Sequence, residues 1–159
     1  MAASAILDKF SSTTSQTMTL ANLASSTAGV GRQCTLLDNT TNRYMDILQY
    51  LKVQSLTATV HTANTSVQVY LLRASTAGTP TRTDAAGASD AALTVKNARL
   101  LGILRFTVTT VDEVTTGDFL INRPGPTWGI AVVQDSGQNL NTTEGNHIKE
   151  FIGLNPEAQ

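Results

Sequence analysis

Few residues in this chain belong to the types that perform covalent or metal chemistry. The sequence has one cysteine, Cys34, and two histidines, His61 and His147, that lie far apart along the chain. A thiol and an imidazole form a nucleophilic dyad only if folding brings them together, and a metal site needs clustered His, Cys, Asp or Glu ligands. Because neither histidine has a ligand partner at helical or strand spacing, we expect each to be a surface or edge residue. A lone cysteine is usually a small buried hydrophobe, and a single thiol excludes an intrachain disulfide.

Paired carboxylates are the next candidates, because glycoside hydrolysis needs two of them facing each other across a cleft. The acids available for such a pair are Asp46, Asp112, Glu113, Asp118 and Glu150. The adjacent pair Asp112 and Glu113 lies between predicted strands and is most simply a solvated turn. Calcium loops, dinucleotide-binding glycine motifs and serine-nucleophile elbows do not occur in the sequence. The sequence therefore predicts that the protein is not an enzyme and needs no cofactor and no metal.

A third chemistry, stacking on sugar rings, depends on aromatic side chains, which make up only 5% of the chain. The single tryptophan, Trp128, shares one face of a predicted strand with Ile130 and Val132, so we expect it to be a core anchor. The alternative is a carbohydrate-recognising module. Its candidate platforms would be Trp128, Tyr44, Tyr50 and Tyr70.

The composition argues against several classes of partner. Charged residues are only 14% of the 159 residues, against about 25% in an ordinary soluble domain, and the formal net charge is -1. Without a basic stripe the chain has nothing to attract a phosphate backbone, so we expect no nucleic-acid binding. No apolar stretch is long enough to cross a membrane, and the first residues lack the basic and apolar regions of a secretory leader. Low charge is typical of surfaces that contact other proteins.

The fold signal is a series of short apolar stretches separated by Thr, Ser, Asn and Gly. Strands are predicted at 17–20, 33–37, 56–61, 66–73, 99–108, 118–121, 128–133 and 147–154. Residues 43–53 fit a strand or a helix, and their aromatic and β-branched residues favour the strand. Many short strands with regular turns predict an all-β fold, an antiparallel β-sandwich of jelly-roll type.

Two segments stand apart from this pattern. Residues 1–16 form a predicted N-terminal arm, in which Ile6, Leu7 and Phe10 could contact a partner; a free tail is the other interpretation. Residues 17–159 form a single predicted sandwich domain. Within it, the Ala-, Gly- and Thr-rich stretch at about 74–93 is expected to be a long exposed loop.

Three segments carry recognisable motifs: the DNTTN segment and the strand after it within 35–46, the RLLG strand at 99–104, and the closing hairpin at 128–141. Together they resemble small virion structural proteins of tailed bacteriophages. Each motif is weak alone, whereas the ordered set covers roughly residues 17–154. The resemblance is to capsid decoration (cement) proteins and related virion proteins with a β-sandwich.

The resemblance implies a structural virion protein that stabilises a phage capsid by binding the surface of the major capsid protein. It further implies a homo-oligomer, expected to be a trimer, on the outer capsid surface of the virion, made in the host cytoplasm. The alternative is a carbohydrate- or receptor-binding sandwich of a phage tail or fibre. The arm and the 74–93 loop have no counterpart in the resemblance, so contact residues are not transferred from it.

Overall fold

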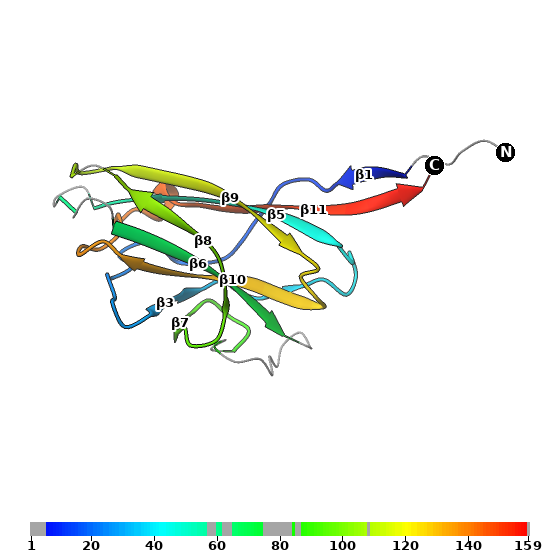
Figure 1. The fold of residues 1–159 in the computed structure, drawn as a ribbon, viewed down its shortest axis with the longest axis horizontal. Helices are drawn as coiled ribbons and strands as arrows, with labels where there is room; N and C mark the ends of the chain where they lie inside the picture. The colour runs from blue at the N-terminus through cyan, green and yellow to red at the C-terminus, as the bar shows by residue number, and fades with distance from the viewer. Residues whose placement is uncertain are drawn as a thin grey trace.

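The fold is a sandwich of two antiparallel β-sheets (Figure 1). The computed structural model describes residues 6–56, 60–61, 65–74, 84, 87–107 and 109–158, with side chains described from residue 9 to 156. The predicted all-β class and antiparallel sandwich are confirmed. No helix among the described residues has the length and apolar character needed to cross a membrane.

The regular elements are mostly strands of four to eleven residues. They are β1 (Ile6–Phe10), β2 (Thr14–Ser15), β3 (Val30–Gln33), β4 (Leu37–Asp38), β5 (Asp46–Gln54), β6 (Thr65–Ala74), β7 (Ala91–Thr94), β8 (Arg99–Phe106), β9 (Val114–Asn122), β10 (Thr127–Asp135), the short 3-10 helix η1 (Glu144–Asn146) and β11 (Ile148–Ala158).

The strand order interleaves distant parts of the chain. The first sheet has the order β1-β11-β5-β9, with β2 also pairing β11, and the second has the order β7-β3-β10-β6-β8, with β4 also pairing β10. From β8 onward, successive strands alternate between the sheets. In Figure 1 the first sheet forms the upper layer and the second the lower layer. The jelly-roll subtype remains a prediction at this point.

The core lies between the sheets and is built from alternating strand residues. In β5 the fully buried residues are Ile47, Gln49, Leu51 and Val53, and they alternate with Leu48, Tyr50 and Lys52, which face outward. The indole of Trp128 on β10 meets the ring of Phe151 on β11 edge to face, with centroids 5.1 Å apart. Trp128 is 1% exposed, so its predicted role as a core anchor is confirmed.

Several predicted strand boundaries are wrong. Residues 17–20 form no strand, although their side chains alternate between buried and exposed. The predicted strand at 33–37 is split into β3 and β4. The Cys34 N–H still donates to the Ile130 carbonyl of β10, but the N–H groups of Thr35 and Leu36 donate to the carbonyls of Thr17 and Ala88 instead. Half of the strand predicted at 56–61, residues 57–59, lies outside the described residues, and residues 56, 60 and 61 are not part of a strand.

The predicted arm and loop also differ from the structure where it describes them. Residues 6–10 are not a free arm, because β1 pairs antiparallel with β11 from Ile6 opposite Ala158 to Phe10 opposite Leu154. The loop is shorter than 74–93, because Ala74 ends β6 and residues 91–94 form β7. Residues 75–83 and 85–86 lie outside the described part.

Candidate interaction surfaces

Cys34 lies in the centre of the core. Its side chain is fully buried, and its Sγ accepts a hydrogen bond from the Ile130 N–H at 3.2 Å. Burial raises the pKa of the Cys34 thiol to about 12, because the apolar surroundings disfavour the thiolate. The expectation of a small buried hydrophobe is therefore correct, and the thiol is protonated at neutral pH.

His61 was expected at the surface or an edge, and this expectation is wrong. Its side chain is buried, stacks at a tilt on Phe106 with centroids 4.7 Å apart, and places Nε2 2.6 Å from Oε2 of Glu113. The other carboxylate oxygen of Glu113 accepts the Thr107 N–H at 2.7 Å. Glu113 is thus not part of a solvated turn. It joins two connections at one end of the sandwich.

His147 is the second histidine that the sequence placed wrongly. It is 4% exposed, its Nε2 lies 3.1 Å from the Asn141 carbonyl oxygen, and its Nδ1 accepts the Gln54 N–H at 3.3 Å. These two contacts assign the proton to Nε2 of a neutral ring. Burial lowers the pKa of His147, because desolvation disfavours the imidazolium.

The fold does not assemble these groups into a reactive site. Cys34 bonds to β10, His61 to the connection after β8, and His147 to the segment before η1. Among the described residues no three His, Cys, Asp or Glu side chains come close enough to hold a metal ion. Cys34 and His61 fill the core, whereas the buried His147 lines a hollow of about 300 Å³ beside η1.

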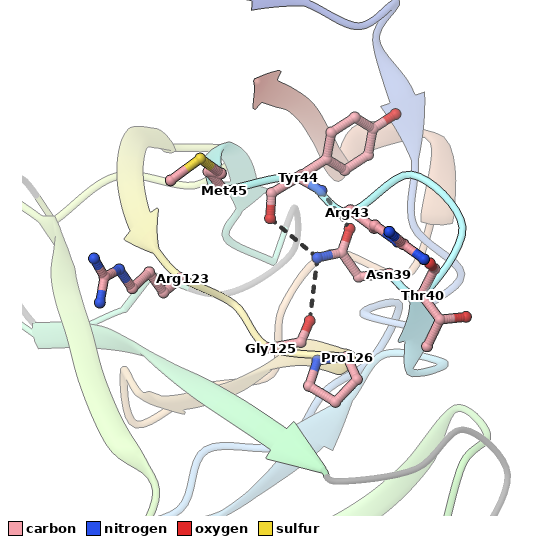
Figure 2. A pocket seen from close by; sticks show the side chains of 8 residues that line it. All are labelled: Asn39, Thr40, Arg43, Tyr44, Met45, Arg123, Gly125 and Pro126. Carbon is pink, nitrogen blue, oxygen red and sulfur yellow. Dashed lines mark hydrogen bonds between the residues drawn. The ribbon is translucent and has the colours of Figure 1, made fainter. Parts of the chain in front are cut away.

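A hollow lies where the DNTTN turn meets the connection between β9 and β10. It has a volume of about 570 Å³ and is lined by Asn39, Thr40, Arg43, Tyr44, Met45, Arg123, Gly125 and Pro126. The buried Asn39 holds its floor: Nδ2 donates to the carbonyls of Tyr44 and Gly125, and Oδ1 accepts the Tyr44 N–H (Figure 2). Arg43 and Arg123 extend to opposite sides in Figure 2, so their guanidinium groups do not converge on one ligand.

The candidate sugar platforms do not share a surface. Trp128 is inside the core, whereas Tyr50 and Tyr70 are half-buried on different sheets. The hydroxyl of Tyr70 donates to Oε1 of Gln68 on the same strand. A carbohydrate site built from these rings together is therefore absent from the geometry.

An apolar row crosses the outer side of the first sheet. Leu120 on β9, Leu48 on β5 and Ile152 on β11 stand directly opposite one another in register. Leu120 is 54% exposed and Leu48 is 36% exposed. We call this outer side of β9, β5 and β11 face A, since it continues across all three strands.

A second row on face A carries acidic groups. Asp118, Tyr50 and Glu150 are likewise opposite one another, one step along the strands from the apolar row. A hollow of about 220 Å³ lies where the two rows meet. It is lined by Thr13, Leu48, Tyr50, Asp118, Glu150, Phe151 and Ile152.

The two chain ends form a two-stranded projection that we call the terminal ribbon, made of β1 and residues 154–158 of β11. Since β5 begins opposite Leu154, the ribbon has no β5 beside it, and it extends beyond the sandwich to the right of Figure 1. On the ribbon Phe10 is 61% exposed. A two-stranded ribbon is only marginally stable alone.

The two edges of the terminal ribbon differ. The Ser11 N–H donates to the Gly153 carbonyl at 2.9 Å, so by antiparallel alternation the backbone groups of Asp8 and its partner Pro156 point away from each other. Pro156 therefore lacks a donor on the free edge of β11, which blocks pairing there. The backbone N–H and C=O groups of Ile6, Asp8 and Phe10 face the outer edge of β1, which pairs with no strand in the described part of the chain, and we call it the open edge.

The sequence offered only a partial signal for these surfaces. Ile6, Leu7 and Phe10 were singled out as contacts, and the structure places all three on β1. Face A was missed because its rows combine residues from strands about 30 to 100 positions apart, and only the strand pairing shows that they meet. Comparison of the chain with protein-family models, curated proteins and solved structures finds no match.

Proposed function

We propose that this chain is a structural virion protein that decorates a phage capsid by binding the surface of the major capsid protein, without catalysis. The outer capsid surface is its proposed place, and a homo-oligomer, expected to be a trimer, is part of the same proposal. The observation that carries it is the open β1 edge of the terminal ribbon.

An open edge strand binds a partner by adding a strand to it. Its main-chain groups give affinity, and the side chains beside them give specificity. In the terminal ribbon, Pro156 blocks one edge and leaves the other available, and the 61% exposed Phe10 stands beside that open edge. An extended segment of a capsid subunit fits this requirement. Many such contacts repeated over a lattice gain avidity from individually weak sites.

The chemistry-bearing residues support a non-enzymatic role. Cys34, His61 and His147 are all buried, and each has a structural contact that accounts for it. A catalytic site needs a nucleophile or base within reach of a substrate. The described residues place none of these three groups on a surface.

The strand order supports the jelly-roll interpretation that the pattern of short strands favoured. Taken along the chain, β1, β3, β5, β6, β8, β9, β10 and β11 fall into two four-stranded layers with interleaved order, as two wrapped Greek keys do. The segments that resemble virion proteins lie on β4 and the turn that leads to β5, on β8, and on β10 with the loop that follows it. This places them in the framework rather than on the terminal ribbon.

Cosedimentation with empty capsids tests the proposal. Asp8→Pro removes an N–H from the open edge and leaves the β1–β11 hydrogen bonds in place, whereas Asp8→Ala keeps that N–H and removes only the carboxylate. We expect wild type and Asp8→Ala to sediment with capsids and Asp8→Pro to stay in the supernatant. If the wild-type chain does not sediment with capsids, the proposed function is wrong. If Asp8→Pro binds capsids as well as the wild type, the proposed role of the open edge is wrong.

A further inference from the structure

The hollow on face A has the chemistry of a socket for a cationic side chain. Asp118 and Glu150 stand on the two strands that flank β5, with Tyr50 between them. Adjacent strands are about 4.8 Å apart, so the two acid-bearing strands are separated by about 10 Å. A guanidinium placed over the Tyr50 ring lies within reach of both carboxylates. Among the described residues neither carboxylate has an ion pair that would compete for it.

The apolar row next to the socket suits the rest of such a side chain and its neighbours. Leu48 and Ile152 line the same hollow as Tyr50. An arginine keeps its methylene stem on apolar surface while its charged head reaches a polar partner. Leu48 and Tyr50 are two positions apart on β5. An incoming strand therefore fits if it presents an arginine over Tyr50 and, two positions away, an aliphatic residue over Leu48.

The chain itself carries such a strand. On β8, Ile103 is 43% exposed and Arg105 is exposed two positions later, both on the outer side of the second sheet opposite Gln68 and Ser66. Two residues of a strand span about 7 Å, the same step that separates Leu48 from Tyr50. The sign of the charge and the spacing both match the socket.

Most of the remaining outer side of the second sheet is already covered. Leu72, Leu93 and Ala131 form a small buried cluster there, packed against Val95 and Ala98 from the segment around β7. On that side β8 keeps its large apolar residues exposed, with Leu100 44% exposed beside Arg99. The surface that matches the socket is thus confined to the outer side of β8.

We propose that copies of this chain associate through these two surfaces, with the socket on face A of one copy receiving Arg105 of β8 from the next. This inference rests on the self-association included in the proposed function and names its interface. The two surfaces lie on opposite outer sides of the sandwich, so the contact is head-to-tail. A head-to-tail contact closes a ring if its rotation permits and otherwise extends a filament.

Charge reversal tests the interface by size-exclusion chromatography with light scattering on the full chain. We expect wild type to have a mass that is a multiple of 16.8 kDa. Asp118→Arg and Arg105→Asp each place like charges in contact, and each should weaken association at least about tenfold. Both changes in one chain restore opposite charges and should restore association. The control Thr41→Arg with Thr142→Arg adds the same net charge as Asp118→Arg at exposed positions outside both surfaces, and it should associate as wild type does.

Far-UV circular dichroism and urea unfolding establish that each variant is folded. The inference is overturned by a wild type that stays monomeric at all concentrations, by a folded Asp118→Arg variant that associates normally, or by a folded double variant that does not recover. Capsid cosedimentation is scored separately. If the wild type is monomeric but binds capsids, only the proposed interface is wrong. If it forms an oligomer but does not bind capsids, only the proposed function is wrong.

Discussion

The ring of Tyr44 packs directly against the backbone of Gly153. A Cβ added to Gly153 would stand 2.3 Å from Cδ1 of Tyr44 and 2.4 Å from two further ring atoms. Gly153 is also the residue whose carbonyl accepts the Ser11 N–H at the base of the terminal ribbon. The contact therefore joins the DNTTN turn to the point where the ribbon leaves the sandwich. An aromatic ring laid over a strand glycine fills the space that a side chain would occupy.

Gly153→Val should displace Tyr44 and destabilise the protein. Overpacking of this kind costs about 1 to 3 kcal/mol, measured as a lower urea midpoint with an unchanged slope. Gly145→Ala is the matched control, because a Cβ at Gly145 meets nothing within 4 Å. Equal midpoints for Gly153→Val and wild type would contradict the contact.

Asn39→Ala should loosen the turn that forms the floor of the larger hollow. The side chain of Asn39 makes three hydrogen bonds. Removing this side chain leaves the backbone N–H of Tyr44 without the Oδ1 acceptor. An unsatisfied group of this kind costs about 1 to 3 kcal/mol. Thr41→Ala, an exposed change in the same turn, should change the free energy of unfolding by less than about 0.5 kcal/mol. Similar midpoints for the two variants would disprove the role of Asn39.

Some of these features could be predicted from the sequence, and others could not. The alternation of Trp128, Ile130 and Val132 was sufficient to predict a buried strand, since apolar periodicity reports burial directly. The contact between Tyr44 and Gly153 was not predictable, because it depends on where β11 passes the turn rather than on local pattern. The same holds for His61 and Glu113, which are 52 positions apart and meet only in the folded chain. β1 was missed as a strand because five residues of mixed polarity show no clear period.

The free energy of unfolding should decrease as the pH is lowered through the range in which His147 titrates. Burial lowers the pKa of His147 in the folded chain below the 6.5 of an exposed histidine, so the unfolded chain takes up a proton first as the pH falls. The free energy of unfolding contributed by the neutral ring is therefore fully present above about pH 6.5. It is lost progressively as the pH falls from there to the folded-state pKa.

Urea unfolding between pH 8 and pH 5 measures this dependence, with His147→Gln as the comparison. The variant cannot titrate at this position, so the difference in unfolding free energy between the two proteins should narrow as the pH falls. A constant difference across the range would mean that His147 does not couple folding to protonation.

Cys34 should resist thiol reagents in the folded protein. The thiol is fully buried, and its burial raises its pKa to about 12. Since the thiolate is the reactive species, the folded protein offers very little of it to a reagent. A chromogenic disulfide reagent at pH 8 should react rapidly in urea and only on the timescale of unfolding in buffer. Rapid reaction in buffer would contradict the buried placement.

A virion reconstruction that locates this chain tests the proposed function most directly. We expect density for the sandwich on the outer surface of the head lattice, with the open edge of β1 against a strand of the major capsid protein. Density confined to a tail tube or fibre tip, or a head lattice from which this sandwich is missing, would contradict it.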